Sequence, residues 1–498
     1  MGQSNRQVVN PLCARCLRAP AARPRLPAFW TEGKTMSETL TCRSPVDGRA
    51  YVERPLASES EIAAALDRAR QAQSDCRHVP VSERQALLKK AVEAFVAKAD
   101  PICEEIAWQM GRPLGHCPGE VRGFEERARY MIEVAPEALA TLETGPKDGF
   151  TRFVKRDPLG VVFVIAPWNY PYLTAVNAIV PALMAGNAVL LKHSAQTPLC
   201  AERFAEAFAA AGLPEGVFQY LHLGHRAALD LISHDGVDFV SFTGSVGAGQ
   251  AVQEAAAKRF IGIGLELGGK DPAYVRADVD VAHAVENLVD GGFFNAGQSC
   301  CGLERIYVHE AVYDQVLDGM VELTKQFSLG NPLEDGTTLG PLVRASAADF
   351  VRGQVEESVA GGAKALIDPK AFKADEAGSP YMAPQILSEV DHSMRVMTEE
   401  SFGPVVGVMK VGSDEQAIEL MNDSAFGLTA SIWTADPEAA VSIGDRVATG
   451  TWFMNRCDYL DPALAWTGVK NSVRGCSLSK IGYEQLTRPK SFHLRTAI

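Results

Sequence analysis

Two adjacent cysteines, Cys300 and Cys301, follow a run of small and polar residues that reads Phe-Asn-Ala-Gly-Gln-Ser from position 294 to 299. Glycine, alanine and serine let a thiol stand clear of the backbone, and the Asn295 and Gln298 amides can orient a polarised carbonyl group. The run therefore predicts a loop that carries a nucleophilic cysteine. Such a site also needs a general base, a donor to an oxyanion and an acceptor for electrons or an acyl group.

Glu266 is the candidate base. It lies among apolar residues and glycines in segment 265–270, which reads Leu-Glu-Leu-Gly-Gly-Lys. Desolvation in such surroundings raises the pKa of a carboxyl group toward the range of a useful general base. On these residues alone, a capping or ion-paired glutamate is the simpler alternative.

Asn169 is the candidate oxyanion donor. It lies in segment 166–171, Ala-Pro-Trp-Asn-Tyr-Pro, directly after an apolar run that predicts a buried strand. A side-chain amide at that place can donate to a developing oxyanion. A turn framed by two prolines is the alternative.

A glycine-rich segment, 242–249, reads Phe-Thr-Gly-Ser-Val-Gly-Ala-Gly and lies between an expected strand and an expected helix. Backbone amides in such a segment can approach a pyrophosphate at the positive end of the helix. The spacing differs from the usual Gly-x-Gly-x-x-Gly, so a turn that simply needs glycines stays open.

Strand and helix patterns alternate between residues 160 and 259. Apolar runs predict strands at 160–165, 188–191, 217–223 and 237–242, and apolar spacings of three and four predict helices at 172–184, 198–211 and 250–259. This alternation indicates a parallel sheet covered by helices on both faces, with a ligand at the carboxyl ends of the strands.

A second alternation follows Glu266. It predicts helices at 280–292 and 312–327 and strands at 305–308, 405–409 and 429–433. The pattern indicates a second α/β domain, whose nucleophile loop faces the first domain across a cleft.

Outside these two regions, the sequence predicts a helical lead-in and two arms. Residues 44–143 are mainly helical in pattern, with helices expected at 59–72, 81–99, 102–111 and 119–135. Segments 151–156 and 491–495 combine apolar and charged residues in the manner of edge strands. Because they lie far apart in the sequence, they are candidates for pairing between subunits.

Size and composition limit the function. A chain of 498 residues suggests two to four domains at roughly 150 residues each, and 47% hydrophobic with 22% charged residues is typical of a globular protein. The net charge of -13 argues against broad binding of nucleic acids or anionic membranes. The apolar stretch 160–191 is interrupted by prolines and asparagines, so it does not predict a membrane span.

The cysteines and the first 35 residues stand apart from this core. Eleven cysteines without regular spacing indicate reduced, cytosolic thiols, and the pair Cys13 and Cys16 lacks a second ligand pair, so no metal site is expected. Residues 1–35 hold six basic residues and one acid. They predict a disordered tail or an upstream start before Met36, with an organellar transit peptide as the alternative.

Taken together, the motifs resemble those of the aldehyde dehydrogenase superfamily, in the family's order, from about Ser44 to the C-terminus. The matching segments are 167–171 (Pro-Trp-Asn-Tyr-Pro), 242–245 (Phe-Thr-Gly-Ser), 266–270 (Glu-Leu-Gly-Gly-Lys), 295–300 (Asn-x-Gly-Gln-x-Cys) and 400–404 (Glu-x-Phe-Gly-Pro). The separation of 34 residues between Glu266 and Cys300 also resembles the family's.

The resemblance implies a Rossmann-like cofactor domain and a second α/β catalytic domain, with small β arms for oligomerisation. The implied limits are 36–142 and 159–265 for the cofactor domain, 266–480 for the catalytic domain, and 143–158 with 481–498 for the arms. A homodimer or homotetramer in the cytoplasm is expected, with a small-molecule aldehyde as the partner and no nucleic acid or membrane.

The resemblance also implies the reaction, in which an aldehyde is oxidised to a carboxylic acid with hydride transfer to NAD or NADP. Cys300 attacks the aldehyde carbon, and the Asn169 amide and the Cys300 backbone N–H hold the oxyanion. Glu266 activates the water that hydrolyses the thioester. Cys301, one position past the motif, is expected to be a structural neighbour with a minor redox role.

For the cofactor, the resemblance implies that Lys192 binds the adenosine ribose and that Gly244 and Ser245 bind the pyrophosphate. Glu400 and Phe402 are assigned to the nicotinamide ribose and ring, with Trp168 beside them. Many NAD-preferring relatives read Lys-Pro-Ser-Glu where this chain reads Lys-His-Ser-Ala at 192–195. Without that glutamate NADP should be tolerated, with Lys192 and Ser194 as phosphate contacts, and the preference between NAD and NADP stays open.

Two further departures concern the proton path and the tunnel mouth. Ala178 and Ser477 stand where some relatives carry a lysine and a glutamate that support the base, so another relay or an ordered water must serve. Segment 465–473, Ala-Trp-Thr-Gly-Val-Lys-Asn-Ser-Val, also departs from the family's Pro-Phe-Gly-Gly-x-Lys-x-Ser-Gly. The family therefore gives no secure placement of this loop.

Substrate clues are mostly negative. Succinate semialdehyde enzymes resemble one another in arginines at the positions of Asn177 and Phe294, so this chain shows no evident partner for a substrate carboxylate there. Aromatic residues that suit an apolar tunnel, or equally the core, are Tyr170, Phe294, Tyr459 and Trp466. They favour a medium aliphatic or aromatic aldehyde, while Arg456 keeps a succinate-semialdehyde-type dehydrogenase open.

Two other classes of function stay open beside the dehydrogenase. A cysteine-dependent esterase would use the same thiol without hydride transfer, but the Glu400-x-Phe402 motif argues against it. A catalytically inactive relative that serves as a binding protein is disfavoured by the presence of Cys300, Glu266 and Asn169.

Overall fold

The structure is a computed structural model that describes residues 39–497. The expected leader, residues 1–35, and the pair Cys13 and Cys16 lie outside the described residues. Within residues 39–497, no helix is long and apolar enough to cross a membrane.

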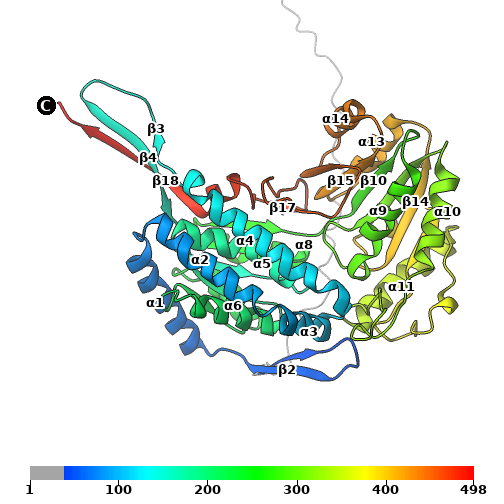
Figure 1. Ribbon diagram of the computed structural model, residues 1–498, viewed down its shortest axis with the longest axis horizontal. Coiled ribbons are helices and arrows are strands. Elements are labelled where there is room, and N and C mark those ends of the chain that lie inside the picture. The colour runs from blue at the N-terminus through cyan, green and yellow to red at the C-terminus, as the bar shows by residue number, and fades with distance from the viewer. Residues whose placement is uncertain (1–38, 498) are drawn as a thin grey trace, which may run out of the picture. The chain divides into compact units, whose positions relative to one another are not determined.

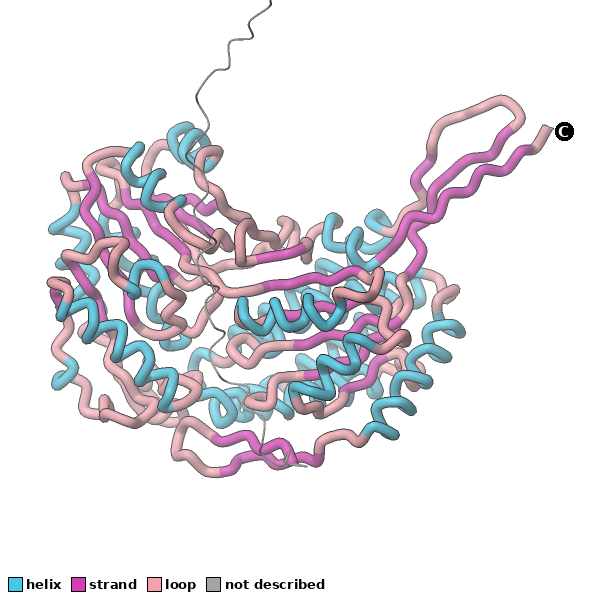
Figure 2. The backbone as a smooth tube through the Cα atoms, turned by 180° about the vertical axis from the view of Figure 1, so that it is seen from behind, coloured by secondary structure: helices cyan, strands magenta, loops and turns pink. Residues whose placement is uncertain are grey.

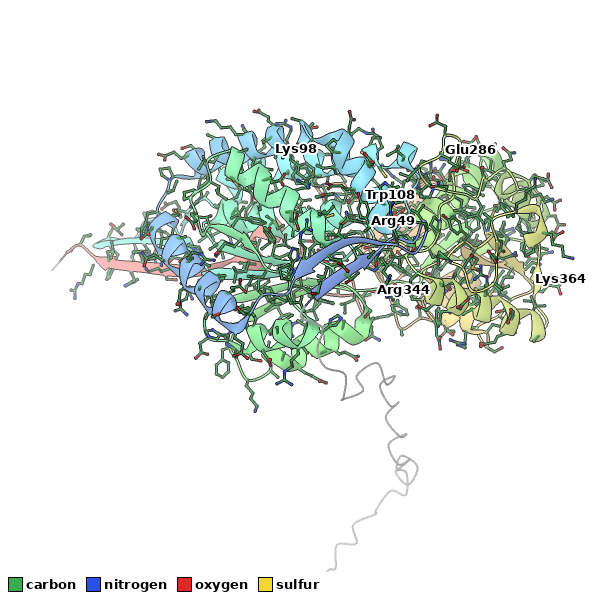
Figure 3. All side chains as sticks on the ribbon, turned by 90° about the horizontal axis from the view of Figure 1, so that it is seen from below. Arg49, Lys98, Trp108, Glu286, Arg344 and Lys364 are labelled. Atoms are coloured by element: carbon green, nitrogen blue, oxygen red, sulfur yellow. The ribbon has the colours of Figure 1, made fainter. Side chains whose placement is uncertain are left out.

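The described chain begins with a hairpin that the sequence analysis missed, since it expected mainly helix from residue 44. Strands β1 (Thr39–Arg43) and β2 (Ala50–Pro55) pair antiparallel. The hairpin packs on a helix through Arg49, whose guanidinium lies 4.0 Å from the Trp108 ring centroid, and the two side chains lie together in Figure 3. This cation–π contact fixes the loop of the hairpin against the helical lead-in.

The expected helices of the lead-in are confirmed. They are α1 (Glu59–Cys76), α2 (Val81–Val96), α3 (Ala99–Met110) and α4 (Pro118–Ala138), with the short 3-10 helix η1 (Leu114–His116) between the last two. Ser58 caps α1 in a capping box with Glu61, and Gly111, in a left-handed conformation, ends α3. These local signals mark the start of α1 and the end of α3, whereas α1 continues past its expected end at residue 72 and α3 starts before its expected start at residue 102.

A six-stranded sheet has the order β17-β9-β8-β5-β6-β7. Its parallel strands are β5 (Val161–Ile165), β6 (Ala188–Lys192), β7 (Phe218–Tyr220), β8 (Phe239–Thr243) and β9 (Gly262–Glu266), and β17 (Val473–Arg474) joins β9 antiparallel. The connecting helices are α5 (Pro171–Ala185), α6 (Pro198–Ala210), α7 (His225–Ser233) and α8 (Val246–Ala256).

Both faces of this sheet are covered, as the apolar runs predict. In β5, Val162 and Val164 join one buried cluster with residues of α2, α4, α5 and α6. Val161 and Phe163 point to the other face and join a cluster with residues of α1, α7 and α8. Figure 1 shows α2, α4 and α5 together on one side. Alternate side chains of a strand face opposite sides of a sheet, so each face needs its own helices.

A seven-stranded sheet has the order β12-β13-β14-β11-β10-β15-β16. Its strands are β10 (Asp271–Val275), β11 (Leu303–His309), β12 (Lys364–Ala365), β13 (Gln385–Ser388), β14 (Val405–Val411), β15 (Thr429–Trp433) and β16 (Thr451–Met454), all parallel except β12. This sheet confirms the expected second α/β unit.

Helices and short helical turns complete the second unit. They are α9 (Val281–Phe293), α10 (Tyr313–Thr324), α11 (Ala345–Ala360), α12 (Arg395–Thr398), α13 (Asp414–Asn422) and α14 (Pro437–Gly444), with η2 (Phe294–Gly297) and η3 (Pro369–Ala371). The tube view in Figure 2 shows these helices around the strands of the sheet.

The two expected arms pair with each other inside one chain, which corrects the idea that they pair between subunits. Strands β4 (Phe150–Pro158) and β18 (Thr487–Arg495) are antiparallel along their full length, with β3 (Leu142–Glu143) beside β4 and η4 (Ile481–Leu486) before β18. Phe153 stacks on Phe492 at 4.6 Å between ring centroids. The arm extends past the helices (Figures 1 and 2). Its backbone groups find partners within the chain, so no second subunit is needed to form it.

Helix α8 begins at Val246, four residues before the expected start at Gln250. Ser245 caps it, because its hydroxyl accepts a hydrogen bond from the Ala248 N–H at 3.4 Å. Gly249 lies within the helix, where a Cβ would come within 2.6 Å of the Leu267 side chain. The glycines therefore allow close packing as well as the turn.

Candidate active site

Two cavities meet at Cys300 and Glu266. A larger cavity of about 380 Å³ is lined by helices α4 and α5, by the residues around Phe294 and by the segment 458–466. A smaller cavity of about 250 Å³ is lined by the residues that follow β5, β8 and β9 and by Glu400 and Phe402. Cys300 and Glu266 are the residues that line both, so the thiol and the carboxylate can be reached from either side.

The nucleophile loop is held by a left-handed backbone. Asn295 and Ala296 have φ values of 55° and 56°, which few non-glycine residues adopt, and they turn the chain sharply after α9. At Gly297 a Cβ would lie 2.2 Å from the Gly403 carbonyl oxygen. Gln298 then fixes the loop, because its side-chain oxygen accepts a hydrogen bond from the Val343 N–H at 2.8 Å. The half-buried Cys300 follows on this support.

The two thiols differ in environment. Cys301 is 3% exposed, and its thiol donates a hydrogen bond to an Asp458 carboxylate oxygen at 2.9 Å. Its hydrogen bond with Cys300, together with burial, raises the pKa of the Cys301 thiol well above its usual range. Cys301 therefore stays a protonated structural thiol, while Cys300 lies at the junction of the cavities.

Glu266 ends strand β9 and receives two hydroxyl donors. The Thr243 hydroxyl donates to one carboxylate oxygen at 3.3 Å, and the Ser477 hydroxyl donates to the other at 2.5 Å. Burial raises the pKa of Glu266, and these two hydrogen bonds and the Arg127 charge partly oppose that effect. The direction of this pKa shift is the one that the sequence predicts for Glu266. Ser477, which the sequence analysis treated as a lost proton-path residue, directly contacts the carboxylate.

Asn169 is fixed behind the nucleophile loop. It is 5% exposed, and its side-chain nitrogen donates to the Gln298 carbonyl oxygen at 3.2 Å. The backbone carbonyl oxygen of Asn169 accepts hydrogen bonds from Arg112 at 2.5 Å and from the Asn295 side-chain nitrogen at 3.3 Å. An amide nitrogen has two N–H groups, so one remains for a ligand in the smaller cavity.

A buried ion pair that the sequence analysis missed supports this arrangement. Arg112, 1% exposed, donates to Glu120 at 2.6 Å and to the Asn295 side-chain oxygen at 3.2 Å. Glu120 also accepts the N–H groups of Tyr172 and Leu173, at 2.8 Å and 2.9 Å, and so caps α5. Nothing in their spacing marks these residues, because the partners come from four different segments.

The smaller cavity holds most of the residues expected at the cofactor. Trp168, Gly244, Ser245, Glu400 and Phe402 line it together. The Phe402 and Trp168 rings meet edge to face at 5.7 Å between centroids. Glu400 accepts a hydrogen bond from the Gly269 N–H at 3.0 Å. Burial, and to a smaller extent the negative charge of Glu304, raises the pKa of Glu400 to about 8. Ser245 opens helix α8, so its backbone suits an anionic group.

A second buried pair, Lys270 with Glu304, holds the Phe402 side of this cavity. Glu304 accepts the backbone N–H groups of Ser401 and Phe402, both at 2.9 Å. Phe402 has a φ of 52°, and these bonds maintain that left-handed conformation. Sequence spacing alone did not reveal the role of this pair.

Lys192 and Ser194 lie at the end of β6 and do not line either cavity. The Lys192 residue is 7% exposed, and its ammonium has no hydrogen bond or ion pair with the described residues. Burial lowers the pKa of Lys192 to about 8. A buried cation without an acid partner suits ribose hydroxyls or a phosphate, so these residues fit a dinucleotide.

The larger cavity contains the aromatic residues that the sequence analysis left between tunnel and core. Tyr170, Phe294, Tyr459 and Trp466 all line it. His116 stacks on Phe294 at 5.2 Å, and the Arg456 guanidinium lies 3.9 Å from the Tyr459 ring centroid. The cavity is therefore aromatic near the thiol, with charged groups around it.

Comparison with known proteins places these features in a family. A model described as the aldehyde dehydrogenase family matches residues 30–492. A probable succinate-semialdehyde dehydrogenase (NADP+) of Synechocystis sp. is 33% identical over 87% of this chain and 95% of its own length.

Solved structures of dehydrogenases are also similar to this chain. An NADP-dependent glyceraldehyde-3-phosphate dehydrogenase of Bacillus halodurans, complexed with NADP, is 32% identical with a TM-score of 0.87, over 93% of this chain and 96% of that one. An NAD-dependent aldehyde dehydrogenase of Sinorhizobium meliloti is 28% identical with the same TM-score, over 92% of each chain. Similar proteins thus use either nicotinamide cofactor.

Proposed function

The chain belongs to the aldehyde dehydrogenase family, and we propose that Cys300 and Glu266 are the nucleophile and the general base of its NAD(P)-dependent oxidation of an aldehyde to a carboxylic acid. The observation that carries this assignment is that these two side chains line both cavities. An aldehyde in the larger cavity and a nicotinamide in the smaller one would then meet at Cys300.

In the first step the Cys300 thiol loses its proton to solvent, and the sulfur attacks the aldehyde carbon to form the oxyanion of a thiohemiacetal. The developing oxyanion is held by the free N–H of the Asn169 amide and by the Cys300 backbone N–H. The contact of Asn169 with the Gln298 carbonyl, at 3.2 Å, keeps that amide beside the loop. A fixed donor costs no reorganisation when the charge develops.

The cofactor is assigned to the smaller cavity and the adjoining end of β6. Glu400 and Phe402 are assigned to the nicotinamide ribose and ring with Trp168 beside them, Gly244 and Ser245 to the pyrophosphate, and Lys192 and Ser194 to the adenosine ribose or its 2′-phosphate. When bound, the nicotinamide would accept a hydride from the thiohemiacetal carbon, whose oxyanion would become the carbonyl of a thioester on Cys300. The chain's own contribution is to hold the substrate carbon close to the cofactor cavity.

In the second step Glu266 takes a proton from a water molecule that attacks the thioester carbonyl. The bond from carbon to sulfur breaks, the acid leaves, and Cys300 is restored. The raised pKa of Glu266 makes it a stronger base than an exposed carboxylate. Thr243 and Ser477 orient the carboxylate through these hydrogen bonds, and Ser477 does so from the position where some relatives carry a glutamate.

Removal of the Ser477 hydroxyl is expected to shift the pH dependence of the second step. The hydrogen bond from Ser477 lowers the pKa of Glu266, so Ser477→Ala should raise that pKa, and the acid side of the kcat profile should move to higher pH. Ser477→Thr keeps a hydroxyl and serves as the control. An unchanged profile in Ser477→Ala would mean that this contact does not set the protonation of the base.

The Lys192 charge is expected to favour NADP over NAD. Lys192→Met should raise KM for NADP by roughly 10-fold or more through loss of a charge-assisted contact, and should affect NAD less. In the wild type, deprotonation of Lys192 near pH 8 should reduce the NADP preference as pH rises. Ratios of kcat/KM for the two cofactors between pH 6.5 and roughly pH 9 measure this. Equal losses for NAD and NADP would contradict a phosphate contact.

For the substrate, the aromatic lining supports a medium aliphatic or aromatic aldehyde. The relative from Synechocystis sp. bears the name of a succinate-semialdehyde dehydrogenase, which supports a semialdehyde as the alternative. Tyr170, Phe294 and Trp466 would contact the chain of either substrate.

The domain limits and assembly are also part of the proposal. We assign 36–142 and 159–265 to the cofactor domain, 266–480 to the catalytic domain, and 143–158 with 481–498 to the oligomerisation arms of a cytoplasmic homodimer or homotetramer. Strand β17 lies in the catalytic range but joins the first sheet. Light scattering of the purified protein tests the assembly, and a monomer at working concentration would contradict it.

A panel of aldehydes assayed with NAD and with NADP tests the function. Growth of reduced-nicotinamide absorbance with at least one aldehyde is expected. Hydrolysis of an activated ester without reduction of either cofactor by any aldehyde would instead indicate the cysteine-dependent esterase.

A further inference from the structure

One wall of the larger cavity contains a buried amide without a partner. Asn177 on α5 is 2% exposed, and neither its side-chain nitrogen nor its side-chain oxygen has a hydrogen-bond partner among the described residues. Buried polar groups are normally paired, because an unpaired one loses its hydrogen bonds to water without replacement. Since Asn177 lines the cavity, a bound ligand is a natural partner.

A buried guanidinium lies on the facing helix. Arg127 on α4 is 8% exposed and lines the same cavity. One of its terminal nitrogens donates to the Leu173 carbonyl oxygen at 2.6 Å, but within the described residues no carboxylate lies within 4.0 Å of it. Burial lowers the pKa of Arg127, as expected for a cation without a close partner.

The two groups share one patch of the wall. The carbonyl that Arg127 contacts belongs to Leu173, one helical turn before Asn177 on α5. Side chains on a helix lean toward its N-terminus, so the Asn177 amide lies over the turn that contains Leu173. Thr174 adds a hydroxyl to the same stretch of the cavity lining.

The acids that act on Arg127 are already engaged elsewhere. Glu120 is occupied by Arg112 and by two backbone N–H groups of α5, and Glu126 accepts the Tyr459 hydroxyl at 2.7 Å. Glu266 accepts Thr243 and Ser477, and Asp458 accepts Ser299 and Cys301. These carboxylates balance the Arg127 charge from a distance and leave its remaining N–H groups for a ligand.

We propose that Arg127 and Asn177 form a subsite for the carboxylate of an aldehyde substrate. A guanidinium offers parallel N–H donors and the amide adds another, which matches the acceptors of a carboxylate. This rests on the proposed function and narrows it, because the substrate becomes a semialdehyde with an acid group away from the reacting carbon. Positions 177 and 294, where succinate semialdehyde enzymes carry arginines, hold Asn177 and Phe294, and the proposed subsite takes its cation from α4 instead.

The test compares succinate semialdehyde with butanal, which has the same number of carbons but no carboxylate. Arg127→Met should lower kcat/KM for succinate semialdehyde by roughly 30-fold, mainly through KM, and change that for butanal by less than about threefold. Arg127→Lys keeps the charge but loses the two parallel N–H donors of the guanidinium, so its kcat/KM for succinate semialdehyde should lie between those of the wild type and Arg127→Met. Asn177→Leu should also lower kcat/KM for succinate semialdehyde, by a smaller factor than Arg127→Met. Arg129→Met, an exposed arginine of α4 that pairs with Glu125, is the matched control.

Three results would overturn the subsite. They are a wild type that does not prefer succinate semialdehyde, equal losses for both aldehydes in Arg127→Met and Arg127→Lys, and a lower kcat with a shifted pH profile on butanal. The last would assign Arg127 to the positioning of Glu266. If the wild type oxidises butanal but shows no charge preference, only the subsite fails. If it oxidises neither these aldehydes nor any of the panel, the proposed function fails with it.

Discussion

Replacement of Cys300 by alanine is expected to abolish aldehyde oxidation, with kcat lowered by roughly 10⁴-fold or more. Without the thiol no covalent adduct forms, and hydride loss from a free aldehyde hydrate has no comparable path. Cofactor binding should persist, because the residues assigned to the cofactor stay in place. Reduced-nicotinamide absorbance measures the rate, and quenching of tryptophan fluorescence measures cofactor binding.

The matched control is Cys301→Ala, which removes the neighbouring thiol. The buried Cys301 thiol is hydrogen-bonded to Asp458 and serves the structure, so this variant should keep kcat within about threefold and lose some stability. If Cys300→Ala stayed active while Cys301→Ala lost activity, the assignment of the nucleophile would be wrong.

Replacement of Glu266 by glutamine is expected to separate the two steps. Turnover should fall by roughly 10²- to 10⁴-fold, because the amide cannot take a proton from the hydrolytic water. A rapid burst of about one reduced nicotinamide per active site should remain if Glu266 serves mainly the second step. Stopped-flow absorbance after mixing enzyme, cofactor and aldehyde measures both phases.

Glu254→Gln, at an exposed position of α8, is the control for loss of a carboxylate and should behave as the wild type. Loss of the burst along with turnover in Glu266→Gln would show that Glu266 also activates Cys300 in the first step.

The sequence was most informative where function depends on short contiguous segments. The residues around Asn169, Glu266 and Cys300 were recognisable because each motif lies in one stretch, directly after a strand or helix that apolar periodicity reveals. Parallel strands bring their carboxyl ends to one edge, so the alternation of strands and helices predicts that Asn169, after β5, and Glu266, at the end of β9, lie at the same edge of one sheet. Cys300 follows helix α9 of the second unit, so this rule does not place it.

Contacts between distant segments were not predictable in this way. Ser477 reaches Glu266 across 211 positions of sequence, and a residue-by-residue comparison had classified it as a loss. Arg112 and Glu120 become important only when α4, α5 and the nucleophile loop come together. Arg456, which kept a semialdehyde open in the sequence, is not among the residues that line the larger cavity, whereas Arg127 on α4 lines it and no motif marks that residue.

The β arms illustrate a different limit. Both segments were recognised as strands, but strand patterns do not state which strand is the partner. The full register between Phe150–Pro158 and Thr487–Arg495 shows that the chain closes on itself. Helix η4 directly precedes β18 and fixes where this strand starts. The position of η4 depends on packing in the folded core, so the strand pattern does not reveal the pairing.

The covalent step at Cys300 is the central claim, and one measurement tests it most directly. Glu266→Gln is mixed with an aldehyde that the wild type oxidises and with the oxidised cofactor, quenched with acid after the burst, and digested for tandem mass spectrometry. The account predicts an acyl group on Cys300, in an amount equal to the nicotinamide reduced, with Cys301 unmodified. Reduced nicotinamide formed without any acyl adduct, or with the adduct on Cys301 or another residue, would contradict it.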